Sequence, residues 1–270
     1  MPQGQAHGSA YHWQDYGQGP RRAFALHCGL ARGAAWGGVA GALGDLMRLR
    51  ALDLPGHGEN ALWDGQGDFN ALSLDVVSDA APEGAFDLIG HSWGGVLALA
   101  LAVRNPERIR SLSLYEPVFF AVAARDGRPE VGENARAFAP VVAAMEAGDW
   151  RAAARLFTQT WGGGLAWEDT PEKTRSYLAD RMPTVAAAND LLNRDAGGIL
   201  DKGRLSALSA PVLLMSGARS PAVVEAVLDG LETRLSDVTR VCLPGADHMA
   251  PITRPGEVAA VIRQHLACDQ

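Results

Sequence analysis

The fold of this chain is decided by FDLIGHSWGGVLALALAV, residues 86–103. The first residues are typical of a short buried strand, and the run after Gly95 is typical of a helix that packs through its Leu and Ala side chains. Between them lies a Gly-x-Ser-x-Gly turn, whose two glycines let the backbone bend sharply and push the hydroxyl of Ser92 out at the carboxyl edge of a sheet. Ser92 is therefore the candidate nucleophile. A glycine-rich turn that contains serine by chance is the alternative.

The residue after Ser92 adds a second element of the same chemistry. The backbone N–H of Trp93 and the positive end of the following helix lie near the oxygen of any acyl group that Ser92 attacks. A serine hydroxyl is a poor nucleophile at neutral pH, so an imidazole must take its proton. His248 follows the last predicted strand, where a loop can reach back to Ser92, and it is the candidate base.

The composition indicates a globular protein that buries a full core. Of its 270 residues, 47% are hydrophobic and 20% charged, which fits one large domain or about two small ones. The net charge of −7 and the lack of a basic cluster argue against a nucleic-acid partner, since phosphate binding needs a basic face. The longest apolar run, 96–103, is too short to span a bilayer, so no membrane partner is expected.

The cysteines indicate a reducing environment. Cys28, Cys242 and Cys268 are odd in number, far apart and without metal-type spacing. We therefore expect neither a disulfide framework nor a metal site, and a cytoplasmic location fits better. The polar residues 1–10 show no secretory signal pattern.

Strand and helix patterns alternate along most of the chain. Strands are expected at 10–16 (an edge strand), 22–27, 49–53, 86–89, 110–115, 212–216 and 240–243, and helices at 36–46, 72–80, 96–103 and 255–266. This alternation predicts a mostly parallel sheet covered by helices on both faces.

The alternation stops between residues 118 and 207, where the pattern favours helices alone. A helical insertion after the sixth strand is typical of a lid over a site at the strand ends. We expect a core formed by residues 1–117 and 208–270 and a helical cap formed by residues 118–207. At least two of the four large aromatic side chains at positions 150, 157, 161 and 167 are expected to form the core of the cap itself.

Four motifs, in this order and at these distances, resemble the α/β-hydrolase superfamily over nearly the whole chain. They are HCG at 27–29, DLPGHG at 53–58, GHSWGG at 90–95 and PGADH at 244–248. The resemblance implies an α/β-hydrolase fold: a mostly parallel eight-stranded sheet, helices on both faces and an inserted helical cap. It also implies Ser92 as nucleophile, His248 as base and an oxyanion hole formed by the backbone N–H groups of Gly29 and Trp93. Cys28 stands where the family usually has glycine, and it is interpreted as a small space-filling residue.

This chain departs from the family pattern at the acidic residue that orients the base. The family most often places an aspartate just beyond the seventh strand, but Ser220 stands at that position here. Some branches take the acid from the end of the sixth strand, where this chain has Glu116, and Glu116 is the preferred acid. The alternatives are that Glu116 only ends a strand or pairs with an arginine, and that Ser220, Asp195 or Asp201 supports His248.

These residues predict a cofactor-free serine hydrolase that cleaves a small carboxylic ester or lactone through an acyl-enzyme intermediate. An acyltransferase, a carbon–carbon bond hydrolase or a peroxidase-like activity is an alternative on the same fold, because fold does not fix function. A dehalogenase is disfavoured, since that chemistry in the superfamily uses a carboxylate at the position of Ser92. A non-catalytic small-molecule binding module is the alternative from a different class, because Ser220 replaces the expected acid.

Overall fold

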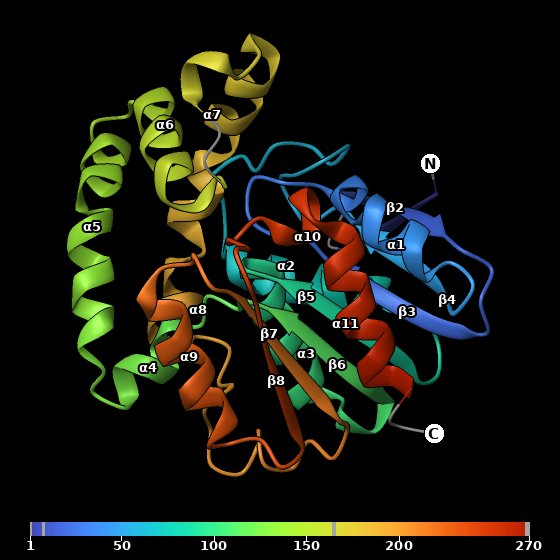
Figure 1. Ribbon diagram of the computed structural model, residues 1–270. Helices are drawn as coiled ribbons and strands as arrows, with labels where there is room; N and C mark the ends of the chain where they lie inside the picture. The colour runs from blue at the N-terminus through green and yellow to red at the C-terminus, as the bar shows by residue number, and fades with distance from the viewer. Residues whose placement is uncertain (1, 7–8, 164–165, 268–270) are drawn as a thin grey trace.

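The computed structural model describes residues 2–6, 9–163 and 166–267, and a central sheet organises them (Figure 1). The sheet has eight strands in the order β1-β2-β4-β3-β5-β6-β7-β8. Pairing is antiparallel between β1 and β2 and between β2 and β4, and parallel from β4 to β8. The strands are β1 Gln3–Ala6, β2 Ser9–Tyr16, β3 Arg21–Leu26, β4 Met47–Leu52, β5 Phe86–His91, β6 Ile109–Tyr115, β7 Val212–Gly217 and β8 Val238–Leu243.

The parallel strands are apolar on both faces, because successive side chains point to opposite sides and helices cover each side. In β3, for example, Phe24 and Leu26 belong to one hydrophobic cluster, whereas Ala23 and Ala25 belong to the other. The first cluster includes helices α2 Phe69–Ala80, α3 Trp93–Arg104 and α9 Ala222–Glu232, and the second includes α1 Gly37–Leu43, α10 Ala250–Thr253 and α11 Pro255–Ala267. The expected sheet with helices on both faces is therefore present.

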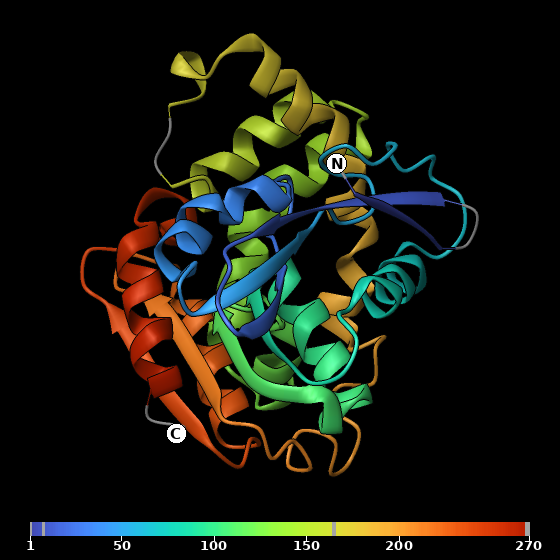
Figure 2. The same ribbon diagram turned by 90° about the vertical axis from the view of Figure 1, so that its right-hand side faces the viewer.

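Between β6 and β7 the chain is helical, as the pattern predicts. The helices are α4 Phe120–Arg125, α5 Pro129–Glu146, α6 Trp150–Trp161, α7 Glu172–Ala187 and α8 Asn189–Arg194. Helices α5, α6 and α7 gather at one end of the molecule, away from α11 (Figures 1 and 2). They enclose a hydrophobic cluster of their own, to which Trp167 and Met182 contribute. Short 3₁₀ helices lie at Gly33–Trp36, Pro106–Arg108 and Trp167–Asp169.

The expectation of an edge strand at 10–16 was wrong, since β2 lies inside the sheet. Strand β1, formed by residues that the sequence pattern left as a polar tail, pairs with its outer side. Polar residues carry little periodic signal, so a hairpin at a sheet edge leaves a weak pattern. In the part of the chain that the structure describes, no helix combines the length and the apolar character needed to cross a bilayer.

Candidate active site

Ser92 lies in a sharp turn between β5 and α3, in a backbone conformation that is rare for residues other than glycine. Its φ is 56° and its ψ is −121°. The turn requires glycine on both sides: a Cβ at Gly90 would lie 2.6 Å from Cα of Gly95, and one at Gly94 would lie 2.4 Å from the carbonyl oxygen of Leu26. Strain of this kind persists where the surrounding structure enforces it. The predicted strand–turn–helix around Ser92 is thus present.

Glu116 follows β6 directly and meets the side chain of His248. Its Oε2 lies 2.7 Å from Nδ1 of His248, and its side chain is fully buried. Oε1 accepts a hydrogen bond of 2.7 Å from the backbone N–H of Gly217 and one of 2.5 Å from the hydroxyl of Ser220. Both oxygens of the buried carboxylate are therefore satisfied, as burial of a charge requires.

The position of Glu116 follows from the strand order. Because β6 lies beside β7, the end of β6 meets the turn that contains Gly217 and Ser220. The backbone N–H of Glu116 donates to the carbonyl of Met215 in β7, and the φ of Glu116 is 45°. This left-handed conformation ends the strand. Arg219 does not hold Glu116, because its guanidinium pairs with Asp247 at 3.1 Å.

The loop that presents His248 is held through its own backbone. Nε2 of His91 lies 2.7 Å from the carbonyl oxygen of His248, and the hydroxyl of Tyr115 donates to the carbonyl of Asp247 at 2.7 Å. On the cavity side, the ring of Trp161 from α6 stands edge-on to the ring of His248, with 4.6 Å between their centroids. These three residues fix the position of the imidazole, and motif reasoning did not assign this role to Tyr115 or Trp161.

Two neutral histidines hold the loop that contains Gly29. Nδ1 of His57 donates to the carbonyl of Pro55 at 2.8 Å, which leaves Nε2 to accept the backbone N–H of Leu30 at 3.0 Å. His27 makes the same kind of link, since its Nε2 accepts from the backbone N–H of Leu54. Burial lowers the pKa of His27 to about 4 and that of His57 to about 3. Both imidazoles are therefore neutral at pH 7, as an accepting nitrogen requires.

Cys28 is a space-filling residue, in agreement with its interpretation from the sequence. The side chain is 3% exposed, and burial raises the pKa of its thiol to about 12. Since the thiolate is the reactive form, this thiol is inert at neutral pH. Cys242 is an exposed free thiol, and Cys268 lies outside the described residues.

A cavity of about 750 Å³ opens over the serine and the histidine. Ser92, Trp93, Gly29 and His248 all line it, so the structure brings together the predicted nucleophile, base and oxyanion donors at one wall. A Cβ built at Gly29 would meet no described atom within 4 Å, so the backbone there is open to a ligand. Helices α5, α6, α7 and α8 supply most of the remaining lining, mainly through apolar and aromatic side chains.

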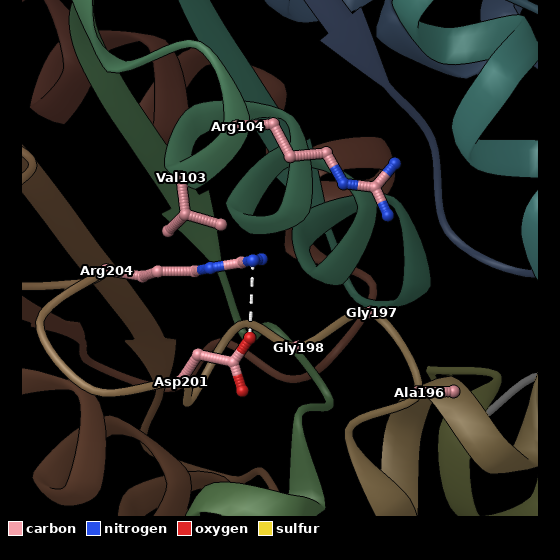
Figure 3. A pocket seen from close by; sticks show the side chains of 7 residues that line it. All are labelled: Val103, Arg104, Ala196, Gly197, Gly198, Asp201 and Arg204. Carbon is pink, nitrogen blue, oxygen red and sulfur yellow. Dashed lines mark ion pairs between the residues drawn. The ribbon is translucent and has the colours of Figure 1, made fainter.

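The two weaker acid candidates lie elsewhere. The carboxylate of Asp195 accepts the backbone N–H groups of Ile199 and Leu200 at 2.7 and 2.8 Å and so closes a local turn. Asp201 pairs with Arg204 at 3.3 Å in an open pocket of about 490 Å³ (Figure 3). This pocket includes Arg104, the last residue of α3, whereas Ser92 precedes the first. About 18 Å of helix separates them.

Three comparisons with known proteins show what this chain is similar to. The family model described as "Alpha/beta hydrolase family" matches residues 6–261. The chain is 32% identical over 257 residues to a pimeloyl-[acyl-carrier protein] methyl ester esterase of Aeromonas hydrophila, and the aligned region covers 92% of this chain and 95% of that protein. It is 28% identical to lipase LipV of Mycobacterium tuberculosis, over 94% of this chain and 97% of that protein.

Among solved structures, haloalkane dehalogenase DatA of Agrobacterium tumefaciens has a similar fold. The TM-score is 0.77 at 20% sequence identity, with 100% of this chain and 96% of that chain covered. At this identity the likeness concerns the fold alone. The predicted fold class is thereby confirmed.

Proposed function

The chain belongs to the alpha/beta hydrolase family, and from this premise we propose that it is a serine hydrolase that cleaves a small carboxylic ester or lactone through an acyl-enzyme. Relatives named esterase and lipase indicate an enzyme that hydrolyses ester bonds. One observation carries the finer assignment: the buried carboxylate of Glu116 lies behind His248, and His248 shares the cavity wall with Ser92.

In the proposed reaction, Oγ of Ser92 attacks the ester carbonyl carbon while Nε2 of His248 takes the hydroxyl proton. His248 then gives this proton to the leaving alcohol as the C–O bond breaks, and the acyl group stays on Ser92. A water molecule, deprotonated by the same imidazole, then attacks the acyl carbon, and the acid leaves as the Oγ–C bond breaks and the imidazole returns the proton to Oγ of Ser92. The backbone N–H groups of Gly29 and Trp93 stabilise the negative oxygen of both tetrahedral intermediates.

Glu116 supports this cycle by fixing one tautomer of the base. Nδ1–H of His248 donates to its Oε2, so Nε2 carries the lone pair that Ser92 needs. The negative carboxylate also stabilises the imidazolium that forms during the attack. The hydroxyl of Ser220 donates a hydrogen bond to Glu116. Ser220, which stands where the family usually has the catalytic aspartate, therefore supports the acid and is not itself the acid.

The residues that line the cavity favour a substrate whose acyl group is neutral and largely apolar. Among the described lining residues, Glu146 is the one carboxylate, and no lysine or arginine is present. Phe138, Phe157 and Trp161 supply aromatic surface, which gains free energy by covering apolar groups. A free carboxylate elsewhere on the substrate would find no lysine or arginine among these described lining residues.

We propose that residues 118–207 act as a cap on a core formed by residues 1–117 and 208–270. Helices α5 to α8, all within this segment, line much of the cavity that also contains Ser92. A cap of this kind excludes water from the reacting ester and selects its acyl group. The geometry of this lining therefore determines which esters reach Ser92.

Labelling with a fluorophosphonate probe tests the proposal. The probe forms a covalent bond with an activated serine, so we expect one labelled residue, Ser92, and turnover of part of a panel of ester, thioester and lactone substrates. Ser92→Ala is the matched control and is expected to abolish both signals. A folded wild-type protein that takes up no label and cleaves no member of the panel would instead be a binding module.

A further inference from the structure

Leu30, next to the proposed oxyanion donor Gly29, belongs to the hydrophobic core of the cap rather than to that of the sheet. The other buried members of its cluster, which are Val141, Ala153, Ala154, Trp167 and Met182, all come from residues 118–207. The side chain of Leu30 is 5% exposed. Its φ is 62°, a left-handed conformation that is costly for a branched residue and that persists only where contacts enforce it.

Tyr177 of α7 holds the same loop by hydrogen bonds. Its hydroxyl donates to the carbonyl of Ala31 at 2.8 Å and accepts the backbone N–H of Gly58 at 3.0 Å. One cap side chain thus joins two loops of the core, 27–32 and 53–58. The guanidinium of Arg181, one turn along α7, stacks on the ring of Tyr177 at 3.5 Å from its centroid and fixes the ring within the cap.

We infer that Tyr177 and Leu30 are positioning residues through which the cap sets the geometry of the oxyanion hole. The inference rests on the proposed function, because it assigns the backbone N–H of Gly29 to the negative oxygen. Gly29 itself has no side chain to anchor it, and its Cβ position is open. The N–H of Gly29 belongs to the peptide that carries the carbonyl of Cys28, and this carbonyl accepts the backbone N–H of Ala31 at 3.2 Å and lies 2.7 Å from Nδ1 of His27. The orientation of this N–H therefore depends in part on Ala31, and both Ala31 and its neighbour Leu30 are attached to the cap.

The core supplies only part of this support. His57 accepts the backbone N–H of Leu30 at 3.0 Å, which places one end of the peptide that links Leu30 to Gly29. The side chain of Leu30 and the carbonyl of Ala31 are held by the cap. A change in the cap would consequently move a backbone donor, and donors in an oxyanion hole act only within hydrogen-bond distance of the developing charge.

The test compares ligands that do and do not use the oxyanion hole. A trifluoromethyl ketone with the acyl chain of the best substrate forms a negative hemiketal oxygen on Ser92, whereas the matching ether has no carbonyl oxygen. In Tyr177→Phe we expect kcat to fall about tenfold with KM within about twofold, since loss of a whole donor costs about 10²–10³. The inhibition constant of the ketone should rise by the same factor, and that of the ether should not change.

Two further variants keep the test decisive. Leu30→Ala keeps the backbone preference at this φ but removes the anchor in the cap, and it should reproduce the kinetic pattern of Tyr177→Phe. Tyr11→Phe removes the hydroxyl of a buried tyrosine that does not line the cavity and is bonded to Asp79, and it should leave all four constants unchanged. Circular dichroism establishes that each variant is folded.

The inference is overturned if the folded variants keep the wild-type kcat, or if the ketone and the ether lose affinity equally. Either result would leave the proposed function intact, because wild-type turnover and labelling of Ser92 are measured separately. A wild-type protein without turnover and without label would overturn both.

Discussion

The hydroxyl of Ser220 lies 2.5 Å from Oε1 of Glu116, so the residue at the family's usual acid position contacts the carboxylate that we propose as the acid of this chain. The two residues come from the ends of neighbouring strands, β7 and β6. In the proposed triad the carboxylate comes from the end of β6 instead of β7, and its Oε2 lies 2.7 Å from Nδ1 of His248.

Glu116→Gln is expected to lower kcat by roughly 10² to 10⁴ with little change in stability. The scale is that of a serine protease whose triad aspartate becomes asparagine, and we adopt it here. The amide oxygen would keep the hydrogen bond from Gly217, which turns the NH₂ group toward Nδ1 of His248 and selects the wrong tautomer. Steady-state kinetics and urea unfolding of the variant measure the two quantities.

Ser220→Ala is expected to cost less than about tenfold in kcat, because only a neutral hydrogen bond to the carboxylate is lost. Ser220→Asp in the Glu116→Gln background should recover part of the lost activity by supplying the charge from β7. If Glu116→Gln kept the wild-type kcat while Ser220→Ala lost most of it, Glu116 would not be the acid and would only end its strand.

Ser92→Ala should remove essentially all ester turnover and leave the fold intact. Alanine has the same backbone preference as serine at the φ of 56°, so the change deletes one oxygen without adding strain. Turnover is measured with the best ester of the panel, and thermal unfolding establishes the fold. Retention of a tenth of wild-type activity would exclude Ser92 as the nucleophile.

Replacing α5, α6 and α7 by a flexible linker should broaden access for bulky esters and weaken selection among small ones. The replacement spares α4 and α8, because Val122 and Leu191 pack in the cluster on the sheet. The replacement also removes the cap contacts of the loop that contains Gly29, so kcat/KM should fall for every substrate. The measurement is therefore the ranking of substrates by kcat/KM and not its absolute value. An unchanged ranking in a folded protein would show that the cap does not select the substrate.

Stability is expected to fall steeply as the pH drops from about 6.5 toward 4. Burial lowers the pKa of His27 to about 4 and that of His57 to about 3, and it lowers the pKa of His91 well below its ordinary value. Below pH 6.5 the unfolded chain therefore binds protons that the folded chain does not. Each histidine then costs up to about 1.4 kcal/mol of unfolding free energy per pH unit.

Urea unfolding at pH 7, 6 and 5 measures this dependence. The urea midpoint should be highest at pH 7 and fall at each step. His57→Gln, which keeps an acceptor for the backbone N–H of Leu30 but cannot titrate, should show a shallower fall. A midpoint that stays constant from pH 7 to pH 5 would contradict the assignment of neutral buried histidines.

The sequence by itself determined the elements whose signals are local. The turn around Ser92 needs glycine at fixed distances, because a Cβ at Gly90 or Gly94 would collide with neighbouring backbone. The alternation of strands and helices and the strand-free stretch 118–207 likewise depend on short-range periodicity. The place of His248 after the last strand follows from the order of the motifs.

Only the tertiary structure decided which side chains from distant parts of the sequence contact one another. Glu116 and His248 are 132 residues apart in the sequence, and their contact depends on the adjacency of β6 and β7 and on the loop that His91 and Tyr115 hold. The link between Tyr177 and Ala31 leaves no sequence signal either, since a backbone carbonyl carries no residue identity. Contacts of this kind arise from packing between distant segments. For that reason the sequence could offer only a few candidate residues for the acid, and only the fold showed which of them contacts His248.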